Sequence, residues 1–226
     1  MKKNIAALAF LLLIPMLTAN AQNLESVLNS MDKAAADFKT AQTDFEWDNF
    51  TKVVEEHELQ KGTMFFRRQG SDVEMAADIN FPAKKSVLFT GGKVSVYVPS
   101  AGQVTEYNAG KNKADFEAFL VLGFGGRGHD LAKSFDVKYA GTEQVQGIKA
   151  ERLELTPKSS RVSKMFNRIT LWIDPARGVS VQQLFNTAEG DYRLAKYSNI
   201  KLNEKLANDV FKLKTSGKVT YLKPNS

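Results

Sequence analysis

The 226-residue chain contains no cysteine, and its 31 lysines and arginines outnumber its 25 acidic residues. The lack of cysteine excludes structural disulfides and thiolate metal sites, so packing and backbone hydrogen bonds must stabilise the fold. The basic residues are dispersed rather than clustered with aromatic residues, which argues against nucleic-acid binding. The positive charge is compatible with an ordinary solvated surface or with loose contact to anionic lipid head groups.

The first 21 residues have the pattern of a cleaved export signal. Two lysines precede an apolar run from Ile5 to Leu17, and the small-residue sequence Ala19-Asn20-Ala21 follows it. The run is shorter than the roughly 20 residues that a membrane-spanning helix needs, and no lipid-modifiable cysteine follows it. We therefore expect a signal peptide over residues 1–21, export to a periplasm, and one soluble domain over residues 22–226.

The segment from Asn23 to Thr40 has the spacing of an amphipathic helix. Its apolar stripe consists of Leu24, Val27, Leu28, Met31, Ala35 and Phe38. Two interpretations stay open. The helix either packs permanently on a sheet, or it covers the open mouth of a curved sheet and moves when a ligand enters.

Most of the remaining chain is predicted to form strands joined by turns. The Gly91-Gly92 pair suits a two-residue hairpin, and Gly141 and Gly147 are expected at turns. Residues 158–167 are expected to form a polar loop, and the polar tail after Lys214 is expected to be frayed or laid along the surface. The predicted strands cover residues 43–54, 56–68, 72–79, 86–90, 93–99, 104–107, 135–140, 142–146, 150–157, 169–173, 179–187 and 192–200.

Such a long meander must curl to bury its apolar face. The fold class is therefore mainly β with some α: a strongly curved antiparallel sheet that forms an incomplete half-barrel closed by helices. Because side chains alternate between the two faces of a strand, one face is predicted to be apolar. We expect its interior to be lined by Phe45, Trp47, Met64, Phe66, Val87, Phe89, Val96, Val98, Leu153, Leu155, Leu171 and Ile173.

An arginine shares a strand face with two of these apolar residues. Arg68 follows Met64 and Phe66 at intervals of two. It either points inward and hydrogen-bonds a covering helix or the polar end of a ligand, because a buried guanidinium needs partners, or it lies at the strand end and extends to water.

The second half of the chain has a characteristic order of strands and turns. Its segments are Leu155-Thr156-Pro157-Lys158, Ile169 to Asp174, Glu189-Gly190, Tyr197-Ser198-Asn199-Ile200-Lys201-Leu202-Asn203 and Val210-Phe211-Lys212-Leu213. This order is similar to that of the periplasmic lipoprotein carrier family LolA, and the likeness covers almost the whole chain after the signal peptide.

The resemblance implies a half-barrel closed by lid and plug helices. It implies that an arginine at the end of the second strand locks the lid, and this role falls on Arg68, with Arg67 as the alternative register because Gln69 replaces the proline of the best-known members. The apolar segment at residues 113–122 is expected to be the plug helix, which adds Phe119 and Leu120 to the lipid-binding cavity.

The function implied by the resemblance is the transport of lipid-modified proteins by a monomeric carrier. Cargo would come from an inner-membrane ABC lipoprotein-release complex and leave at an outer-membrane acceptor. A periplasmic lipid- or glycolipid-binding protein, or a lipoprotein sensor on the same fold, stays open as an alternative, and an enzyme with dispersed carboxylates is a third.

Motifs of enzymes are weak in this sequence. Residues 123–128 match the G-x-G-x-x-G dinucleotide pattern, but about six residues separate them from the next predicted strand, too few for the crossover helix that the motif requires. A glycine hinge is the favoured interpretation. His57 and His129 lie in unrelated contexts, and no G-x-S-x-G sequence occurs. We expect no cofactor, no metal and no catalytic residues.

Overall fold

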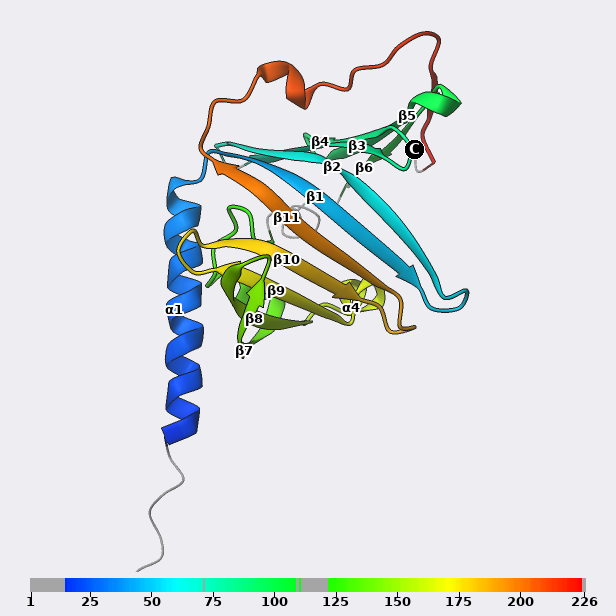
Figure 1. The fold of residues 1–226 in the computed structure, drawn as a ribbon. Helices are drawn as coiled ribbons and strands as arrows, with labels where there is room; N and C mark the ends of the chain where they lie inside the picture. The colour runs from blue at the N-terminus through cyan, green and yellow to red at the C-terminus, as the bar shows by residue number, and fades with distance from the viewer. Residues whose placement is uncertain (1–14, 71, 109, 111–121, 225–226) are drawn as a thin grey trace, which may run out of the picture.

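One sheet of twelve strands dominates the described residues, 15–70, 72–108, 110 and 122–224, of the computed structural model (Figure 1). The strands are β1 (Thr40–Thr51), β2 (Glu56–Gln69), β3 (Asp72–Phe81), β4 (Lys85–Thr90), β5 (Lys93–Val98), β6 (Gln103–Asn108), β7 (Phe135–Val145), β8 (Ile148–Pro157), β9 (Arg168–Asp174), β10 (Val179–Asn186), β11 (Tyr192–Leu202) and β12 (Thr220–Leu222).

The sheet consists of two antiparallel meanders that join along β1 and β11. Its spatial order is β12-β6-β5-β4-β3-β2-β1-β11-β10-β9-β8-β7. The sheet curls so that β2–β6 face β7–β10 across a concave side, and it does not close into a barrel (Figure 1). The predicted strongly curved half-barrel is confirmed, and the Gly91-Gly92 hairpin is present with both glycines at positive φ.

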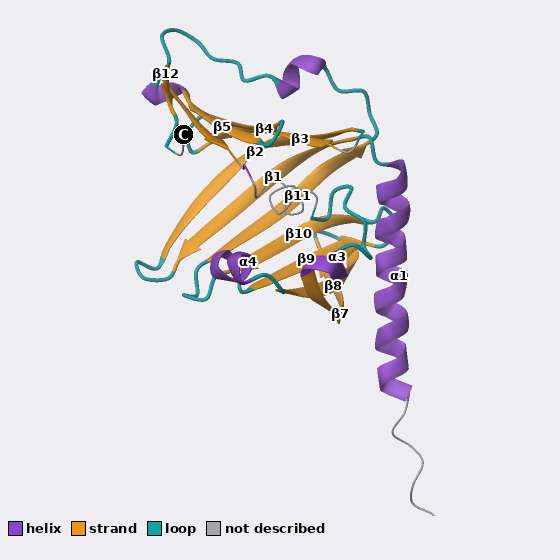
Figure 2. Ribbon diagram, turned by 180° about the vertical axis from the view of Figure 1, so that it is seen from behind, coloured by secondary structure: helices purple, strands orange, loops and turns teal. Residues whose placement is uncertain are grey.

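In the part of the chain that the structure describes, the helices are few and, apart from one, short. They are α1 (Pro15–Asp37), α3 (Leu131–Ser134), α4 (Ser160–Met165), η1 (Pro99–Ala101) and η3 (Asn208–Phe211). Figure 2 shows α1 standing along the end of the curl where β1 begins and β11 ends. The helix starts earlier than the predicted Asn23 and runs across the predicted end of the signal peptide. None of the helices in the described part of the chain is long and apolar enough to span a membrane.

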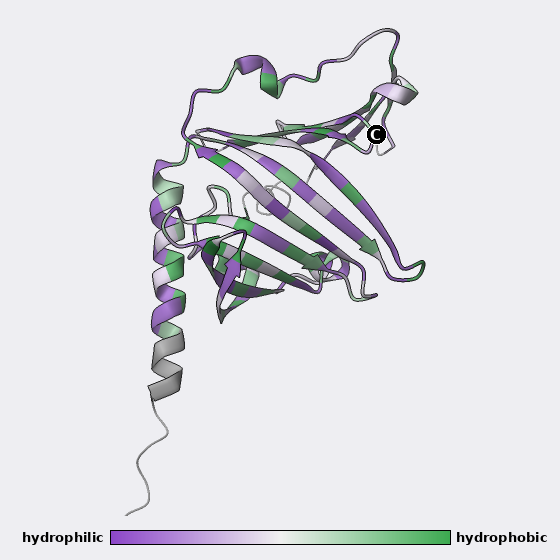
Figure 3. Ribbon diagram, in the orientation of Figure 1, coloured by the Kyte–Doolittle hydropathy of each residue, from purple (hydrophilic) through white to green (hydrophobic). Residues whose placement is uncertain are grey.

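Strand register places the predicted apolar face on the concave side. Phe45 pairs with Tyr197 across β1 and β11, and with Gly62 across β1 and β2. Because directly paired residues point to the same side, the register extends this face from β1 to both edges. Figure 3 shows the corresponding alternation of apolar and polar residues along the central strands.

The convex side of β3 and β4 is covered by the C-terminal segment. Phe211 in η3 packs with Ala76 and Leu88, and Leu206 and Val210 pack beside it. The segment arches over β3–β5 and ends in β12, which pairs in parallel with β6 (Figure 2). This covering explains why the outward side chains of these strands are buried although they lie on the side away from the hollow.

Two predictions about connections are wrong. Residues 158–167 contain α4 rather than only a loop, because Val162 is buried in the core of the β7–β9 half. Gly141 lies in a register irregularity within the single strand β7 instead of forming a turn. The polar tail is laid along the surface, and its exposed residues Thr220–Leu222 form β12, where pairing with β6 satisfies the backbone.

Candidate functional site

The helix α1 packs its apolar stripe on one half of the concave face. Val27, Leu28 and Met31 are buried in a cluster with side chains of β8 and β9. Members of this cluster from the strands, such as Leu153 and Leu171, have no solvent exposure. The β7–β9 half of the hollow is therefore filled by the protein itself in this conformation.

The other half of the concave face is closed by aromatic rings from two loops. Phe124 stacks on Phe66 with ring centroids 5.1 Å apart and meets the edge of Tyr197 at 5.0 Å. Phe38, which directly follows α1, is buried in the same cluster. Phe124 thus spans the hollow from β2 to β11, two strands that flank β1.

Arg68 connects the sheet to both covering segments. Its Nη1 donates to the carbonyl oxygen of Ala35 in the last turn of α1 at 2.7 Å, and its Nη2 donates to the carbonyl of Gly125. The guanidinium also lies 5.4 Å from the centre of the Phe38 ring. The last carbonyls of a helix lack partners within the helix, so a cation there supplies hydrogen bonds to them and also interacts favourably with the helix dipole.

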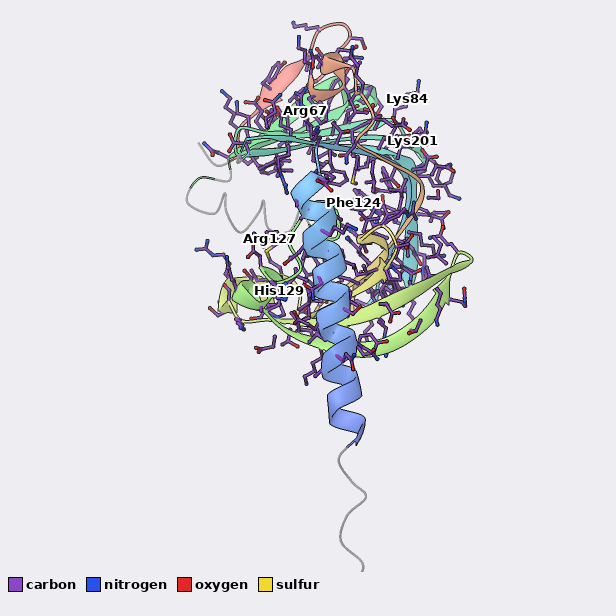
Figure 4. All side chains as sticks on the ribbon, turned by 90° about the vertical axis from the view of Figure 1, so that its left-hand side faces the viewer. Arg67, Lys84, Phe124, Arg127, His129 and Lys201 are labelled. Atoms are coloured by element: carbon purple, nitrogen blue, oxygen red, sulfur yellow. The ribbon has the colours of Figure 1, made fainter. Side chains whose placement is uncertain are left out.

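The neighbouring Arg67 serves the opposite face of the sheet. It forms an ion pair with Glu74 at 2.6 Å, donates to Asn208 and lies 4.2 Å from the centre of the Phe211 ring. Figure 4 labels Arg67 in the upper part of the molecule, beyond the strands that separate it from α1. The geometry therefore places Arg68, not Arg67, against the covering helix.

The segment that carries Phe124 is anchored to β10 as well. Gln183 donates to the carbonyl of Leu122, and the backbone amide of Ser180 donates to the carbonyl of Gly123 at 2.8 Å. The Tyr197 hydroxyl donates to Gln183 at 3.0 Å, and burial raises the pKa of Tyr197 well above its usual range. These buried polar side chains are satisfied by each other and by the loop backbone, so the loop packs in a defined position.

Glycines permit the close approach of the covering segments. Gly125 has a φ of 81°, and a Cβ atom there would meet the Phe38 ring at 2.5 Å. Gly178, with a φ of 64°, lies under α1, where a Cβ would meet the Ser30 carbonyl oxygen at 2.3 Å. Larger residues at either position would separate α1 or the Phe124 loop from the sheet.

A polar cluster holds the loop after Gly128 to the exposed side of α1. His129 Nδ1 lies 2.7 Å from Asp32, and its Nε2 lies 3.1 Å from Glu25. Hydrogen bonds with these carboxylates raise the pKa of His129; partial burial raises the pKa of Asp32, but the bonds from His129 outweigh it and lower that pKa. Arg127 approaches Asp32 at 3.7 Å, and Figure 4 shows Arg127 and His129 beside α1.

A cavity of about 660 Å³ lies between α1, the β2–β3 hairpin and the loop before α3. Arg68 and Arg127 contribute its cationic side chains, and Met31, Val73 and Leu122 contribute apolar surface. A volume of this size is typical of a small-molecule site. The cavity therefore lies where α1 contacts the sheet.

A family model described as outer membrane lipoprotein carrier protein LolA matches residues 36–214, which is most of the chain. The chain belongs to the LolA family. A comparison with curated proteins finds no match. The family assignment agrees with the curved, open sheet described above.

Solved structures share the LolA-like fold at low sequence identity. An uncharacterized conserved protein from Thermus thermophilus matches 88% of this chain and 98% of its own, with a TM-score of 0.57 and 12% identity. The match to MucB covers 88% of this chain and 65% of the MucB chain, with a TM-score of 0.56 and 14% sequence identity. The match to the MucA/MucB complex of Pseudomonas aeruginosa covers 85% of this chain and 61% of that chain, with a TM-score of 0.50 and 16% sequence identity. This chain therefore spans less than two thirds of the MucB length, and these identities establish the fold alone.

The structure of this LolA-family protein brings the predicted strand residues of the cavity together on the concave face. Phe45, Met64, Phe66 and Phe89 form one buried cluster, and a second contains Leu153, Leu155, Leu171 and Ile173. The half-buried residues are Trp47, Val87, Val96 and Val98. Phe119 and Leu120, together with nearly all of the predicted plug helix, lie outside the described residues.

Sequence reasoning missed the polar residues on this LolA-like concave face. Gln183 and Tyr197 are buried there, and the signal that was available is their place in the same alternation as Phe185 and Ala195. Buried glutamine on an apolar face indicates a specific backbone partner, here the Leu122 carbonyl.

The glycine-rich sequence at residues 123–128 cannot hold a dinucleotide. Phe124 is buried, Gly128 touches the backbone of Leu28 in α1, and the following helix α3 has four residues. The glycines let the chain pass close to Phe38 and to α1. The predicted hinge beside the plug helix stays a prediction, because nearly all of the plug helix lies outside the described residues. Within the described ranges, no group of three or more His, Asp or Glu side chains is arranged to hold a metal ion.

Proposed function

We propose that this protein is a periplasmic carrier that binds the acyl chains of lipid-modified proteins in its half-barrel and transports them from the inner to the outer membrane. Membership of the LolA family supports this proposal. The signal-peptide pattern of residues 1–21 supports export, and residues 22–226 act as one domain. The protein works as a monomeric binding protein and not as an enzyme.

The observation that carries the proposal is the position of Arg68. It reaches across the mouth of the hollow to carbonyl groups of α1 and of the Phe124 loop, so one side chain holds two covering segments over an apolar face. Hydrogen bonds to carbonyls can break and re-form without loss of the sheet. A ligand that enters under α1 breaks them, and their re-formation favours release.

The apolar face supplies the binding energy for the acyl chains. Burial contributes about 25 cal/mol per Å² of apolar area, which requires few directed contacts with the ligand. The half-buried Val87, Val96 and Val98 offer such area without first displacing α1, and the fully packed β8–β9 surface becomes available when α1 moves. Affinity is therefore expected to increase with acyl-chain length.

In this proposal the protein receives cargo from an inner-membrane ABC lipoprotein-release complex and delivers it to an outer-membrane acceptor. Native mass spectrometry of protein purified from the periplasm tests the assignment. Retained triacylated protein supports the carrier. Substrate turnover without any retained ligand supports an enzyme and refutes the proposal.

A second candidate is a lipid-binding or lipoprotein-sensing protein on the same fold. The structural likeness to MucB, which is solved in complex with MucA, favours it because a LolA-like fold there takes part in a protein complex. Retention of a free lipid, with no lipidated protein in the same native spectra, would favour this candidate over the carrier.

A further inference from the structure

Three charged or polar side chains form a row on the concave face, at the opposite end of β1 from α1. Asn49 on β1 is paired directly with Arg193 on β11 and with Glu58 on β2. The next inward pair on the same face includes Trp47 and Ala195, which belong to the concave core. The row therefore presents a cation, an amide and a carboxylate toward the hollow.

Arg193 is fixed in position by uncharged groups. Its Nε donates to the Asn49 side-chain oxygen at 2.7 Å, and its guanidinium lies 5.4 Å from the centre of the Trp47 ring. Arg193 and Glu58 are both exposed to solvent. Desolvation by the surrounding protein still lowers the pKa of Arg193, and the nearby Tyr197 and Glu58 offset part of this effect. The ordinary pKa of arginine is so high that the side chain stays charged. Within the described part of the chain, Arg193 pairs with no carboxylate.

Glu58 is held on the other side of Asn49. Its carboxylate accepts a hydrogen bond from Gln60 at 2.6 Å, and the Asn49 amide donates to its backbone carbonyl at 3.3 Å. Because Glu58 and Arg193 lie two strands apart, their Cα atoms are separated by about 10 Å. This arrangement leaves opposite charges on the same face but unpaired, at a separation similar to that between the phosphate and the ammonium of a dipolar head group.

We propose that this row binds the head group of a zwitterionic phospholipid, with its phosphate at Arg193, its ammonium at Glu58 and its acyl chains along the apolar face. The inference rests on the proposed acyl-chain binding and names a further ligand class for the same hollow. A guanidinium binds phosphate oxygens through charge-assisted, often bidentate hydrogen bonds. The carboxylate accepts hydrogen bonds from the ammonium, and the Trp47 ring covers the apolar part of the head group.

Competitive lipid retention tests the proposal on the full exported chain. The delipidated protein is incubated with an equal mixture of dioleoyl phosphatidylethanolamine, dioleoyl phosphatidylglycerol and dioleoylglycerol, and the retained lipids are quantified by mass spectrometry. The three lipids have identical acyl chains, so differences in retention report the head group. The variants are Arg193→Gln and Glu58→Gln, with Arg161→Gln on the exposed side of α4 as the matched control.

The wild type is expected to retain phosphatidylethanolamine over dioleoylglycerol by roughly fivefold, the effect of one charge-assisted contact at a partly exposed site. Arg193→Gln should abolish this preference, Glu58→Gln should shift retention toward phosphatidylglycerol, and Arg161→Gln should leave it unchanged. Equal retention of all three lipids, or a preference for phosphatidylglycerol in the wild type, overturns the head-group site while acyl-chain binding stands. Retention of none of them overturns the proposed function as well. Thermal unfolding of each variant establishes that it is folded.

Discussion

Replacing Arg68 by leucine should release α1 without unfolding the sheet. The substitution removes the hydrogen bonds to the carbonyls of Ala35 and Gly125 but keeps an apolar side chain against Phe38. A hydrogen bond from a charged donor contributes about 1.5–3 kcal/mol. Arg68 is only half-buried, so water competes for these groups, and we expect the two bonds together to contribute about 2–3 kcal/mol.

This free energy sets the size of the measurable effect. A loss of about 2–3 kcal/mol from the closed state corresponds to about a 30- to 150-fold increase in the open population of α1. Hydrogen-exchange mass spectrometry of residues 27–35 measures it, because their amides exchange when α1 leaves the sheet. Faster binding of a fluorescent fatty acid should accompany the faster exchange.

The adjacent arginine provides the matched control. Arg67→Leu removes contacts with Glu74, Asn208 and Phe211 on the convex side. It should therefore increase exchange in residues 206–213 and leave α1 protected. If α1 exchange is the same in Arg68→Leu as in the wild type, or if Arg67→Leu accelerates it equally, the assignment of the lock to Arg68 is wrong.

Three further predictions concern other contacts of the covers. Hydrogen bonding raises the pKa of His129 above 6.5, so protonated His129 stabilises the closed state at lower pH. This contribution disappears as the pH rises through the raised pKa. The Tm difference between the wild type and His129→Gln should therefore shrink as the pH rises. Gly178→Val should lower the free energy of unfolding by about 2–4 kcal/mol more than Gly147→Val, because both glycines have positive φ but only Gly178 touches α1. Equal losses of the two variants in chemical denaturation would contradict this contact. Phe211→Ala should lower the free energy of unfolding by about 3–5 kcal/mol and deprotect only the C-terminal segment, as judged by Tm and hydrogen exchange.

The sequence was sufficient to predict the sheet and its inward face. Alternation along each strand is a local property, so Phe45 and Trp47 could be assigned to one face before their partners were known. The two-residue turn at Gly91-Gly92 also fixed a register, because its length permits one hairpin pairing. Each predicted strand overlaps a strand of the sheet for these reasons.

Features that depend on distant segments could not be predicted in this way. Alternation places Arg68 on the same face as Met64 and Phe66, but its partners lie in α1 and those of Arg67 in the C-terminal segment, and strand spacing does not reveal them. The row of Arg193, Asn49 and Glu58 combines three strands that are distant in sequence. Alternation places each of them on a face, but the order of the strands decides that they are neighbours.

The packing of α1 limits how a reversible carrier can be built on this fold. Val27, Leu28 and Met31 are buried on the face that acyl chains would use, so helix and ligand compete for the same apolar area. Each such side chain contributes about 1.5–3 kcal/mol, and stronger packing would lower the apparent affinity in proportion to the open population. Polar contacts avoid this conflict. Arg68 and His129 stabilise the closed state through polar contacts with α1. These contacts occupy none of the apolar area that the ligand needs. Closure can therefore be adjusted at these two residues while the apolar face stays suited to the ligand.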